Sequence, residues 1–216
     1  MIIFIMLLTL CLSGIYADGI NLTKFSELAT QRYGEPALKT VTALQQLLTS
    51  LNNANDEQKL KAINDFFNQR LEFVDDYYIW KQSDYWATPL ESIGKEAGDC
   101  EDFSIAKYTF LKLLNINNNK LRLTYVRAKL YEGEIKTVKA HMVVSYYTTP
   151  TSDPLVLDNI NPEILPASKR PDLTPIFSFN DKGLWVGGST QPKSSSQNNL
   201  SKWRDVLTRI HADGIE

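Results

Sequence analysis

Apolar residues recur at a helical period through the first half of the chain. Positions three and four apart carry Leu, Val, Ile, Phe or Ala, and this spacing predicts helices. The predicted helices cover Leu22–Tyr33, Pro36–Asn52, Asn55–Phe73 and Asp99–Leu114. Acids at the start of the third segment favour a helix N-terminus there. Its apolar stripe is formed by Leu60, Ile63, Phe66, Phe67 and Leu71.

The hydrophobic period changes to two in the second half. In the segment KLRLTYVRAKLY, Leu121, Leu123 and Tyr125 alternate with polar residues, which predicts a half-buried strand. Glu132 and Gly133 predict a turn, after which IKTVKAHMVVSYY predicts a returning strand. The remaining predicted elements are short strands at PLVLDNI, PIFSFN and GLWVG, and an amphipathic helix at NLSKWRDVLTRIHADG.

Helices therefore precede strands, an order typical of an α+β fold rather than a wound α/β fold. We expect the N-terminal helices, including one that begins near Cys100, to pack on an antiparallel sheet. The aromatic-rich segment VDDYYIWKQSDYWATPLESIG is interpreted as an ordered loop with short turns. A Ser-rich segment near residues 190–198 is predicted to be mobile.

The composition indicates a globular protein with a core of ordinary size. The chain has 216 residues, of which 43% are hydrophobic and 22% charged. Its formal net charge of −2 provides no basic footprint for nucleic acid or anionic lipid, so we expect no nucleic-acid partner. Residues 18–216 are expected to form a single domain.

The N-terminus has the pattern of an export signal. Residues 2–12 are almost all apolar, a run too short to span a membrane comfortably, and small residues then lead to Ala17. We expect residues 1–17 to be a signal peptide cleaved after Ala17, with no stable membrane insertion afterwards. An uncleaved tether, a lipid anchor on Cys11 and a buried N-terminal helix are the alternatives.

Loss of this segment would leave Cys100 as the lone cysteine, inside the acidic stretch GDCEDF. An exported protein with one unpaired thiol is unusual, because oxidising compartments favour pairing, and this favours a chemical use for Cys100. The alternative is an inert buried cysteine. A cysteine nucleophile needs a base, and the chain has two histidines. His141, in a predicted strand, is the candidate base or else a core histidine, and His211 is interpreted as solvated.

A third group is expected to orient the imidazole by accepting a hydrogen bond from its other nitrogen. Asp158 ends the apolar segment PLVLD, where a neighbouring strand gives way to a loop. Its alternative role is that of an ordinary turn residue. Asn159 and Asn161 are the other candidates, although Asn159 would face the opposite side of an extended chain.

The acids around Cys100 allow two interpretations. Asp99 at the N-cap and Asp102 at the third helical position have the spacing of a capping box, whereas Glu101 has no position in that capping box. A helix N-terminus favours the thiolate, but three nearby carboxylates oppose it unless a cation offsets them. Oxygen ligands of this kind suit calcium, so we hypothesise a metal site formed by Asp99, Glu101 and Asp102.

Two aromatic residues before this helix are candidates for substrate contact. Tyr85 and Trp86 precede Pro89 in the aromatic-rich segment and are expected to line a substrate groove. Packing over the sheet is the equally weighted alternative, because aromatic side chains dominate both cores and interfaces.

Several separated motifs together resemble the bacterial transglutaminase-like cysteine proteinases, in particular their LapG-type, adhesin-processing members. The motifs are DYWATPLESIGKEAGDCEDFSIAKYTFL, AHMVVSYY, LVLDNI, RPDLTPIFSFN and GLW, and the similarity runs from about Phe25 to Trp185. The resemblance implies a papain/transglutaminase-like fold and a catalytic triad of Cys100, His141 and Asp158. It also implies a calcium site beside the nucleophile.

The same resemblance implies a function. It predicts a periplasmic, calcium-dependent cysteine endopeptidase that cleaves a large biofilm adhesin near its N-terminus, at an alanine-rich site, and so releases it from the cell surface. The implied partner is the periplasmic part of an inner-membrane receptor that senses cyclic di-GMP. Two alternatives stay open: a transglutaminase-type enzyme that cross-links proteins, and a non-catalytic binding module on the same fold.

Overall fold

The computed structural model describes residues 16–17, 19–133, 135–193 and 200–216. Apart from Tyr16 and Ala17, the predicted signal peptide lies outside these ranges, as do Cys11 and most of the segment near residues 190–198 that was predicted to be mobile. The helices in the described part of the chain are α1 (Leu22–Tyr33), α2 (Glu35–Ser50), α3 (Asp56–Arg70), α4 (Asp76–Trp80), α5 (Pro89–Lys95), α6 (Cys100–Leu113) and α8 (Ser201–Ala212).

The strands form one large sheet and two small ones among the described residues. The large sheet is antiparallel, in the order β10-β9-β5-β6-β7-β8. Its strands are β5 (Leu121–Glu132), β6 (Ile135–Tyr146), β7 (Leu155–Leu157), β8 (Leu165–Pro166), β9 (Leu173–Phe179) and β10 (Leu184–Val186). The small sheets pair β1 (Tyr16–Ala17) with β2 (Ile20–Asn21), and β3 (Glu72–Phe73) with β4 (Ala97–Gly98).

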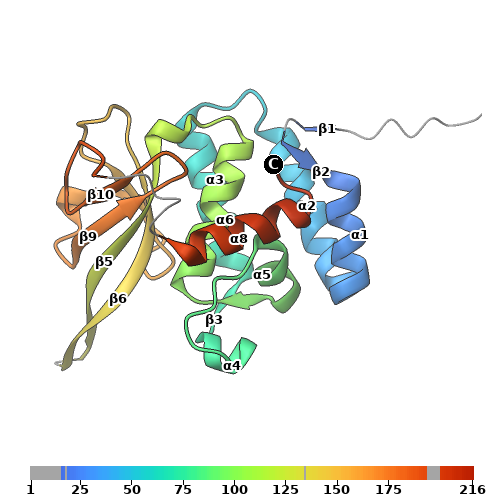
Figure 1. Ribbon diagram of the computed structural model, residues 1–216, viewed down its shortest axis with the longest axis horizontal. Coiled ribbons are helices and arrows are strands. Elements are labelled where there is room, and N and C mark those ends of the chain that lie inside the picture. Colours follow the sequence, from blue (N-terminus) through green and yellow to red (C-terminus); the bar gives the residue numbers. More distant parts are fainter. Residues whose placement is uncertain (1–15, 18, 134, 194–199) are drawn as a thin grey trace, which may run out of the picture.

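Figure 1 shows the large sheet on one side of the molecule and most helices on the other, with α6 between them. Helix α6 contacts β5 and β6 on its sheet side and α3 and α5 on its helical side. A helix enclosed in this way must be apolar around most of its circumference. The core residues of α6 are Phe103, Ile105, Ala106, Tyr108, Phe110 and Leu111.

The helices that periodicity predicts are confirmed. Helix α1 has the predicted bounds, and α3 begins with a capping box in which Asn55 and Gln58 each satisfy a backbone N–H of the other. None of the helices in the described ranges combines the length and apolar character needed to cross a membrane.

The aromatic-rich segment contains two short helices rather than turns alone. Asp75 caps α4, and Thr88 caps α5, where Pro89 takes the first helical position and Glu91 completes a capping box. Both helix starts rest on local capping chemistry. The short helices bring this segment against the N-terminus of α6, where β3 and β4 also pair.

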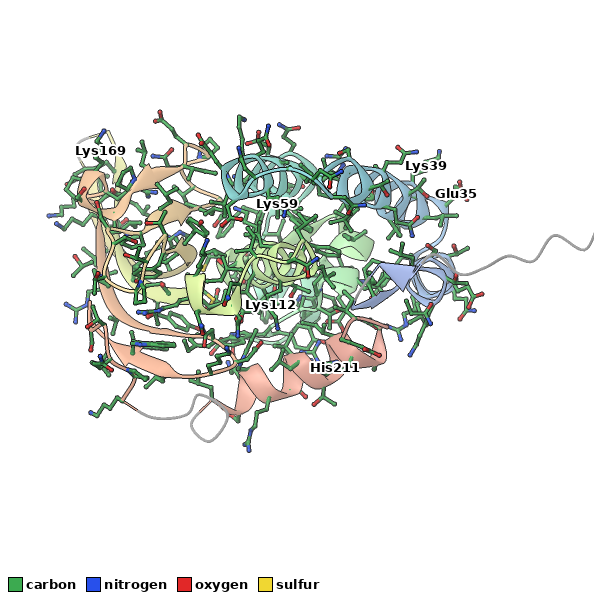
Figure 2. The ribbon with its side chains drawn as sticks, turned by 90° about the horizontal axis from the view of Figure 1, so that it is seen from above. Glu35, Lys39, Lys59, Lys112, Lys169 and His211 are labelled. Carbon is green, nitrogen blue, oxygen red and sulfur yellow. The ribbon has the colours of Figure 1, made fainter. Side chains whose placement is uncertain are left out.

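Helix α8 closes the molecule across α6 and the sheet. Its buried Trp203 packs edge-on against Tyr108 of α6 and Phe179 of β9. In Figure 2, His211 of α8 lies on the outer side of the molecule, and its side chain is exposed. The structure therefore supports the interpretation of His211 as a solvated residue.

Candidate active site

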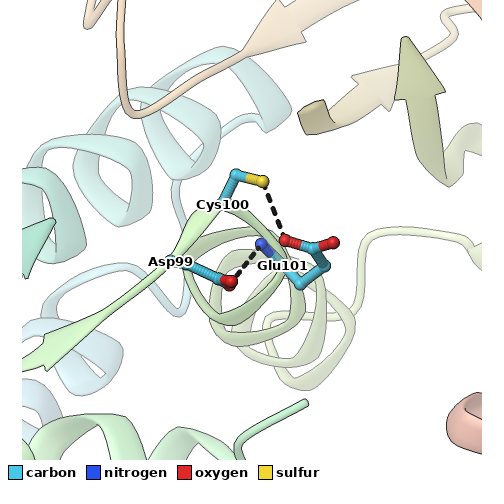
Figure 3. Close-up of side chains that lie close together, drawn as sticks. All are labelled: Asp99, Cys100 and Glu101. Carbon is cyan, nitrogen blue, oxygen red and sulfur yellow. Dashed lines mark hydrogen bonds between the residues drawn. The ribbon is translucent and has the colours of Figure 1, made fainter. Parts of the chain in front are cut away.

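Cys100 is the first residue of α6, and Asp99 is its N-cap. The Asp99 carboxylate accepts a hydrogen bond of 3.2 Å from the backbone N–H of Glu101, as Figure 3 shows. The sulfur therefore lies at the N-terminus of a fourteen-residue helix, which is the positive end of the helix dipole. Unpaired backbone N–H groups at such an end can also bind a developing oxyanion.

Asp102 completes the capping box and is fully buried. Its Oδ2 atom accepts a 3.3 Å hydrogen bond from the backbone N–H of Asp99, and its Oδ1 atom accepts one of 2.7 Å from that of Ala87. Gly98 makes this close approach possible, since a Cβ atom there would lie 2.7 Å from the Cβ of Asp102. The capping interpretation of Asp99 and Asp102 is thus confirmed.

The Cys100 thiol is buried beside Glu101. Its S–H donates a 2.8 Å hydrogen bond to Oε2 of Glu101, and the hydroxyl of Tyr125 donates to Oε1 of the same carboxylate at 3.2 Å. Burial, followed by the charges of Glu101 and Asp99, raises the pKa of Cys100 far above its ordinary value. A backbone hydrogen bond from Met142 acts in the opposite direction and lowers this pKa.

His141 and Asp158 form a buried pair on the sheet. The imidazole Nε2–H donates to Oδ1 of Asp158 at 2.8 Å, and both side chains are almost inaccessible to solvent. The pairing of Val144 with Leu157 places Asp158 just past the end of β7, beside the part of β6 that carries His141. The antiparallel register thus brings together the two residues that the sequence proposed as base and orienting acid.

Asp158 is held ionised by its neighbours. Burial alone would raise the pKa of its carboxyl, but the hydrogen bond and charge of His141, with further bonds from the Ile160 N–H and Arg170, hold that pKa well below its usual range. Of the alternatives, Asn161 accepts a bond from the backbone N–H of Glu163 and so stabilises a turn. Among the described residues, Asp158 is therefore the candidate whose hydrogen bond to the imidazole the structure shows.

The two parts of the predicted triad are carried by elements that pack together. Helix α6, which begins with Cys100, contacts β6, which carries His141, and the hydroxyl of Ser104 on α6 donates a 3.0 Å hydrogen bond to the carbonyl of Met142. Within the described part of the chain, the sulfur donates its hydrogen bond to Glu101 and makes none to the His141 ring. Because Nε2 of His141 is bound to Asp158, Nδ1 is the nitrogen through which the ring would exchange a proton with a thiol.

An acidic cluster adjoins the nucleophile. Oxygen atoms of Asp76, Asp99 and Asp102 all lie within 4.8 Å of one another, and ligand atoms of Asp99, Cys100 and Glu101 form a second such group. Burial, followed by the neighbouring acids, raises the pKa of Asp99 to about 10. Burial is also the main cause that raises the pKa of Asp102 to about 8. These acids would therefore ionise readily only beside a cation.

The cluster has the donor set of a hard cation. Asp76 is 2% exposed, and its Oδ2 atom accepts a hydrogen bond from the backbone N–H of Tyr85. Its Oδ1 atom is buried without a hydrogen-bond partner among the described residues. A buried carboxylate with one orphaned oxygen, lying beside other carboxylates, fits calcium, which takes several oxygen ligands. The sequence predicts Asp99, Glu101 and Asp102 as the metal ligands, whereas the folded structure adds Asp76 to the acidic cluster.

Asp76 carries no distinctive signal in the sequence. It is the second acid of VDDYY, and the first acid, Asp75, is the N-cap of α4. Only the packing of α4 beside β4 brings Asp76 to the start of α6.

The two aromatic residues proposed for a substrate groove have different surroundings. Trp86 is 5% exposed and stacks on Phe179 with ring centroids 6.0 Å apart, so its contacts are those of a core residue. Tyr85 is half-buried, donates its hydroxyl hydrogen to Glu91 at 2.9 Å and lies beneath the guanidinium of Arg209. A role for either in substrate binding stays a prediction.

Comparison with known proteins identifies the family. Residues 32–186 match the family described as bacterial transglutaminase-like cysteine proteinase, BTLCP. The chain belongs to this family. The predicted membership is therefore confirmed, and with it the assignment as a cysteine protease.

Solved structures of LapG from Legionella pneumophila are similar to this proteinase over most of both chains. The EGTA-treated form is 38% identical with a TM-score of 0.76, and the match covers 88% of this chain and 97% of LapG. The calcium-bound form is 38% identical with a TM-score of 0.73, covering 88% and 98%. No curated protein matches the chain. The predicted α+β, transglutaminase-like fold is confirmed.

Proposed function

We propose that this proteinase is a periplasmic, calcium-dependent cysteine endopeptidase that cleaves a large biofilm adhesin near its N-terminus, at an alanine-rich site, and so releases it from the cell surface. The family membership and the similarity to LapG support the reaction class. The observation that carries the proposal is the buried hydrogen bond of 2.8 Å between His141 and Asp158, with His141 on the strand β6 that packs against α6, the helix that begins with Cys100.

The proposed reaction begins with transfer of the Cys100 proton to His141. The thiolate attacks the carbonyl carbon of the scissile peptide bond, and backbone N–H groups at the start of α6, including that of Cys100, stabilise the oxyanion. The imidazolium of His141 then protonates the leaving amine. Water, deprotonated by His141, hydrolyses the thioester and restores the thiol.

Asp158 keeps the His141 ring productive throughout this cycle. By accepting the Nε2–H, it fixes the tautomer and the ring orientation that leave Nδ1 for proton exchange with the thiol. Its ionised carboxylate also stabilises the imidazolium that forms once Cys100 has lost its proton.

Calcium dependence is supported by the acidic cluster and by the calcium-bound form of LapG. In this chain, Asp76, Asp99 and Asp102 would hold the ion, with Glu101 as a further candidate. A bound divalent cation would offset the negative charge that raises the pKa of the Cys100 thiol, and it would join the start of α4 to the start of α6.

Location and partner rest on the sequence. The predicted signal peptide supports export to the periplasm, and the resemblance supports binding to the periplasmic part of an inner-membrane cyclic di-GMP receptor. Edman sequencing of the protein from a periplasmic extract should find an N-terminus after Ala17, and the receptor's periplasmic domain should retain the mature protein on a column. An intact N-terminus in the cytoplasmic fraction would refute export, and absence of retention would refute the partner.

The experiment that tests the proposed function is cleavage of an N-terminal adhesin fragment with paired alanines. The wild-type protein should cut it in calcium, and Cys100→Ala should abolish cutting while circular dichroism shows an intact fold. His211→Gln is the matched control, because His211 is exposed on α8, and it should cut normally. Retained cutting by Cys100→Ala, or incorporation of a labelled amine into a glutamine-bearing protein without peptide cleavage, would overturn the endopeptidase proposal.

A further inference from the structure

Arg170 is a buried cation bound directly to Asp158. It follows the 3₁₀ turn Ala167–Lys169 and is 4% exposed. One terminal nitrogen of its guanidinium donates a hydrogen bond of 2.7 Å to Oδ2 of Asp158. A buried arginine paired with a buried carboxylate forms a strong, charge-assisted bond of defined direction.

The guanidinium is itself held in place from its other side. Asp172 accepts hydrogen bonds from the Nε of Arg170 at 3.0 and 3.2 Å, and one of 2.8 Å from the nitrogen that also reaches Asp158. The backbone is tied as well, since the Arg170 N–H donates to Ala167 and the Leu173 N–H donates to Arg170, both at 3.0 Å. The arginine therefore has little freedom to leave Asp158.

The two carboxylate oxygens of Asp158 thus have different partners, His141 and Arg170. Oδ1 accepts from His141 at 2.8 Å and from the Ile160 N–H at 3.0 Å, whereas Oδ2 accepts from Arg170. A carboxylate with a strong hydrogen bond to one oxygen cannot rotate without breaking that hydrogen bond, so its other oxygen keeps a fixed direction. The position of Arg170 consequently decides where Asp158 presents Oδ1.

We propose that Arg170 is a positioning residue of the reaction centre: it holds Oδ2 of Asp158 so that Oδ1 faces the His141 ring, and Asp172 anchors Arg170 for this purpose. In the part of the chain that the structure describes, Arg170 makes no hydrogen bond to the thiol or the imidazole, so its proposed action passes through Asp158. This inference rests on the proposed function, because it assigns Arg170 a part in the same catalytic site.

Charge sharing gives the proposal a second consequence. The positive charge of Arg170 partly neutralises Asp158. Without Arg170, the Asp158 carboxylate should stabilise a protonated His141 more strongly. Two further charged groups face this site: Lys107 on α6, which the charge of Asp158 influences, and Asp172 beside Arg170. The titration must therefore be read on the His141 ring itself rather than from activity alone.

The test compares Arg170→Gln, Arg170→Lys and Asp172→Asn with the wild-type protein. Arg170→Gln should lower kcat about 10- to 100-fold, the usual cost of losing a group that orients a reacting residue, while KM stays within about twofold. Arg170→Lys keeps the charge and should recover part of the lost kcat. Arg204→Gln, which removes an exposed arginine of α8, is the matched control and should leave both constants unchanged.

NMR titration of the imidazole provides the readout that a merely structural arginine would not move. His141 and His211 are the two histidines of the chain, so His211→Gln assigns the signals. In Arg170→Gln the His141 midpoint should move to higher pH, because Asp158 is then neutralised less. In Asp172→Asn the His141 midpoint should move to lower pH. Without the charge of Asp172, the Arg170 charge neutralises Asp158 more fully, so Asp158 stabilises the imidazolium less.

The outcomes separate this inference from the proposed function. If the wild-type protein cuts no adhesin but the His141 midpoint moves as described, the function fails and the positioning role stands. If cleavage is normal and the His141 midpoint is the same in wild type, Arg170→Gln and Asp172→Asn, the positioning role is refuted and the function stands. Should Arg170→Gln fail to fold, Asp172→Asn decides alone, because the Asp172 side chain is 35% exposed.

Discussion

Asp102 accepts a 2.7 Å hydrogen bond from the backbone N–H of Ala87, fifteen residues earlier in the chain. This bond joins the segment before α5 to the first turn of the helix that carries the nucleophile. The same carboxyl group caps α6 and belongs to the acidic cluster with Asp76 and Asp99. One buried side chain thus connects the loop to the helix cap and also lies in the proposed calcium site, and substitutions can separate these contributions.

Asp102→Ala and Asp102→Asn should differ in stability. The alanine variant leaves the N–H groups of Ala87 and Asp99 without their acceptor and should lower the free energy of unfolding by about 1–3 kcal/mol for each. The asparagine variant keeps one acceptor oxygen, whereas its NH2 group would face the other backbone N–H, so without calcium it should lose less stability than the alanine variant. Urea denaturation in chelator measures both. Equal losses in the two variants would contradict the capping role.

Calcium should stabilise the protein through the acidic cluster. At about 100 times its dissociation constant, a ligand bound only by the folded state adds about 2.7 kcal/mol to the free energy of unfolding, and excess EGTA should reverse the resulting rise in Tm. Asp76→Asn removes the charge behind the orphaned Oδ1 atom and should weaken this response. Differential scanning calorimetry with and without calcium tests it.

The matched control for that measurement is Glu27→Gln, which neutralises an exposed acid of α1. It should keep the full calcium response. A full response in Asp76→Asn as well would exclude Asp76 as a ligand, and no response in the wild-type protein would leave Asp99 and Asp102 as capping residues only.

Stability should rise with pH through the titration of Lys107. Burial of this lysine on α6 lowers its pKa from 10.5 to about 7, although the charges of Asp158 and Asp65 act in the opposite direction. Between pH 7 and 10.5 the unfolded chain therefore binds more protons than the folded protein, so the free energy of unfolding increases with pH across this window.

Lys107→Met should consequently be more stable than wild type by a few kcal/mol at pH 6, and the gain should shrink as the pH approaches 10. Chemical denaturation at several pH values measures the difference. Lys39→Met, an exposed lysine of α2 labelled in Figure 2, is the control and should show no such trend. A gain that does not vary with pH would contradict the buried-ammonium explanation.

Trp86→Ala should destabilise the fold. The ring is buried between Phe179 and Tyr125, and truncating a buried tryptophan costs about 3–5 kcal/mol through lost contacts and the cavity left behind. Trp86→Phe fills part of the space and should lose less. Thermal unfolding compares the two variants. Normal stability of Trp86→Ala together with a raised KM would instead make Trp86 a substrate contact.

Much of the fold and part of the site were predictable because they depend on neighbours in the chain. The periodicity of the helices and the spacing of Asp99 and Asp102 are local patterns, and the structure has both. The alternation at the start of β5 correctly predicts a strand, but its polar residues Arg122 and Thr124 are buried as well, so the strand is not half-buried there. Cys100, His141 and Asp158 could be proposed from the scarcity of cysteine and histidine and from the strand end at PLVLD. Burial of His141 beside Asp158 then follows from a simple antiparallel register.

Tertiary packing alone decided the rest, because those contacts join segments whose spacing in the chain carries no information about distance. Asp76 reaches Asp102 only after α4 packs beside β4, and Arg170 reaches Asp158 only after a turn returns the chain to the sheet. The sequence by itself determined which residues could do chemistry and where the longer helices and the strands β5 and β6 lie, but not the short helices α4 and α5. The folded core determined which acid is left unpaired, which cation orients Asp158, and that Trp86 is enclosed, since close packing places side chains from distant segments against one another.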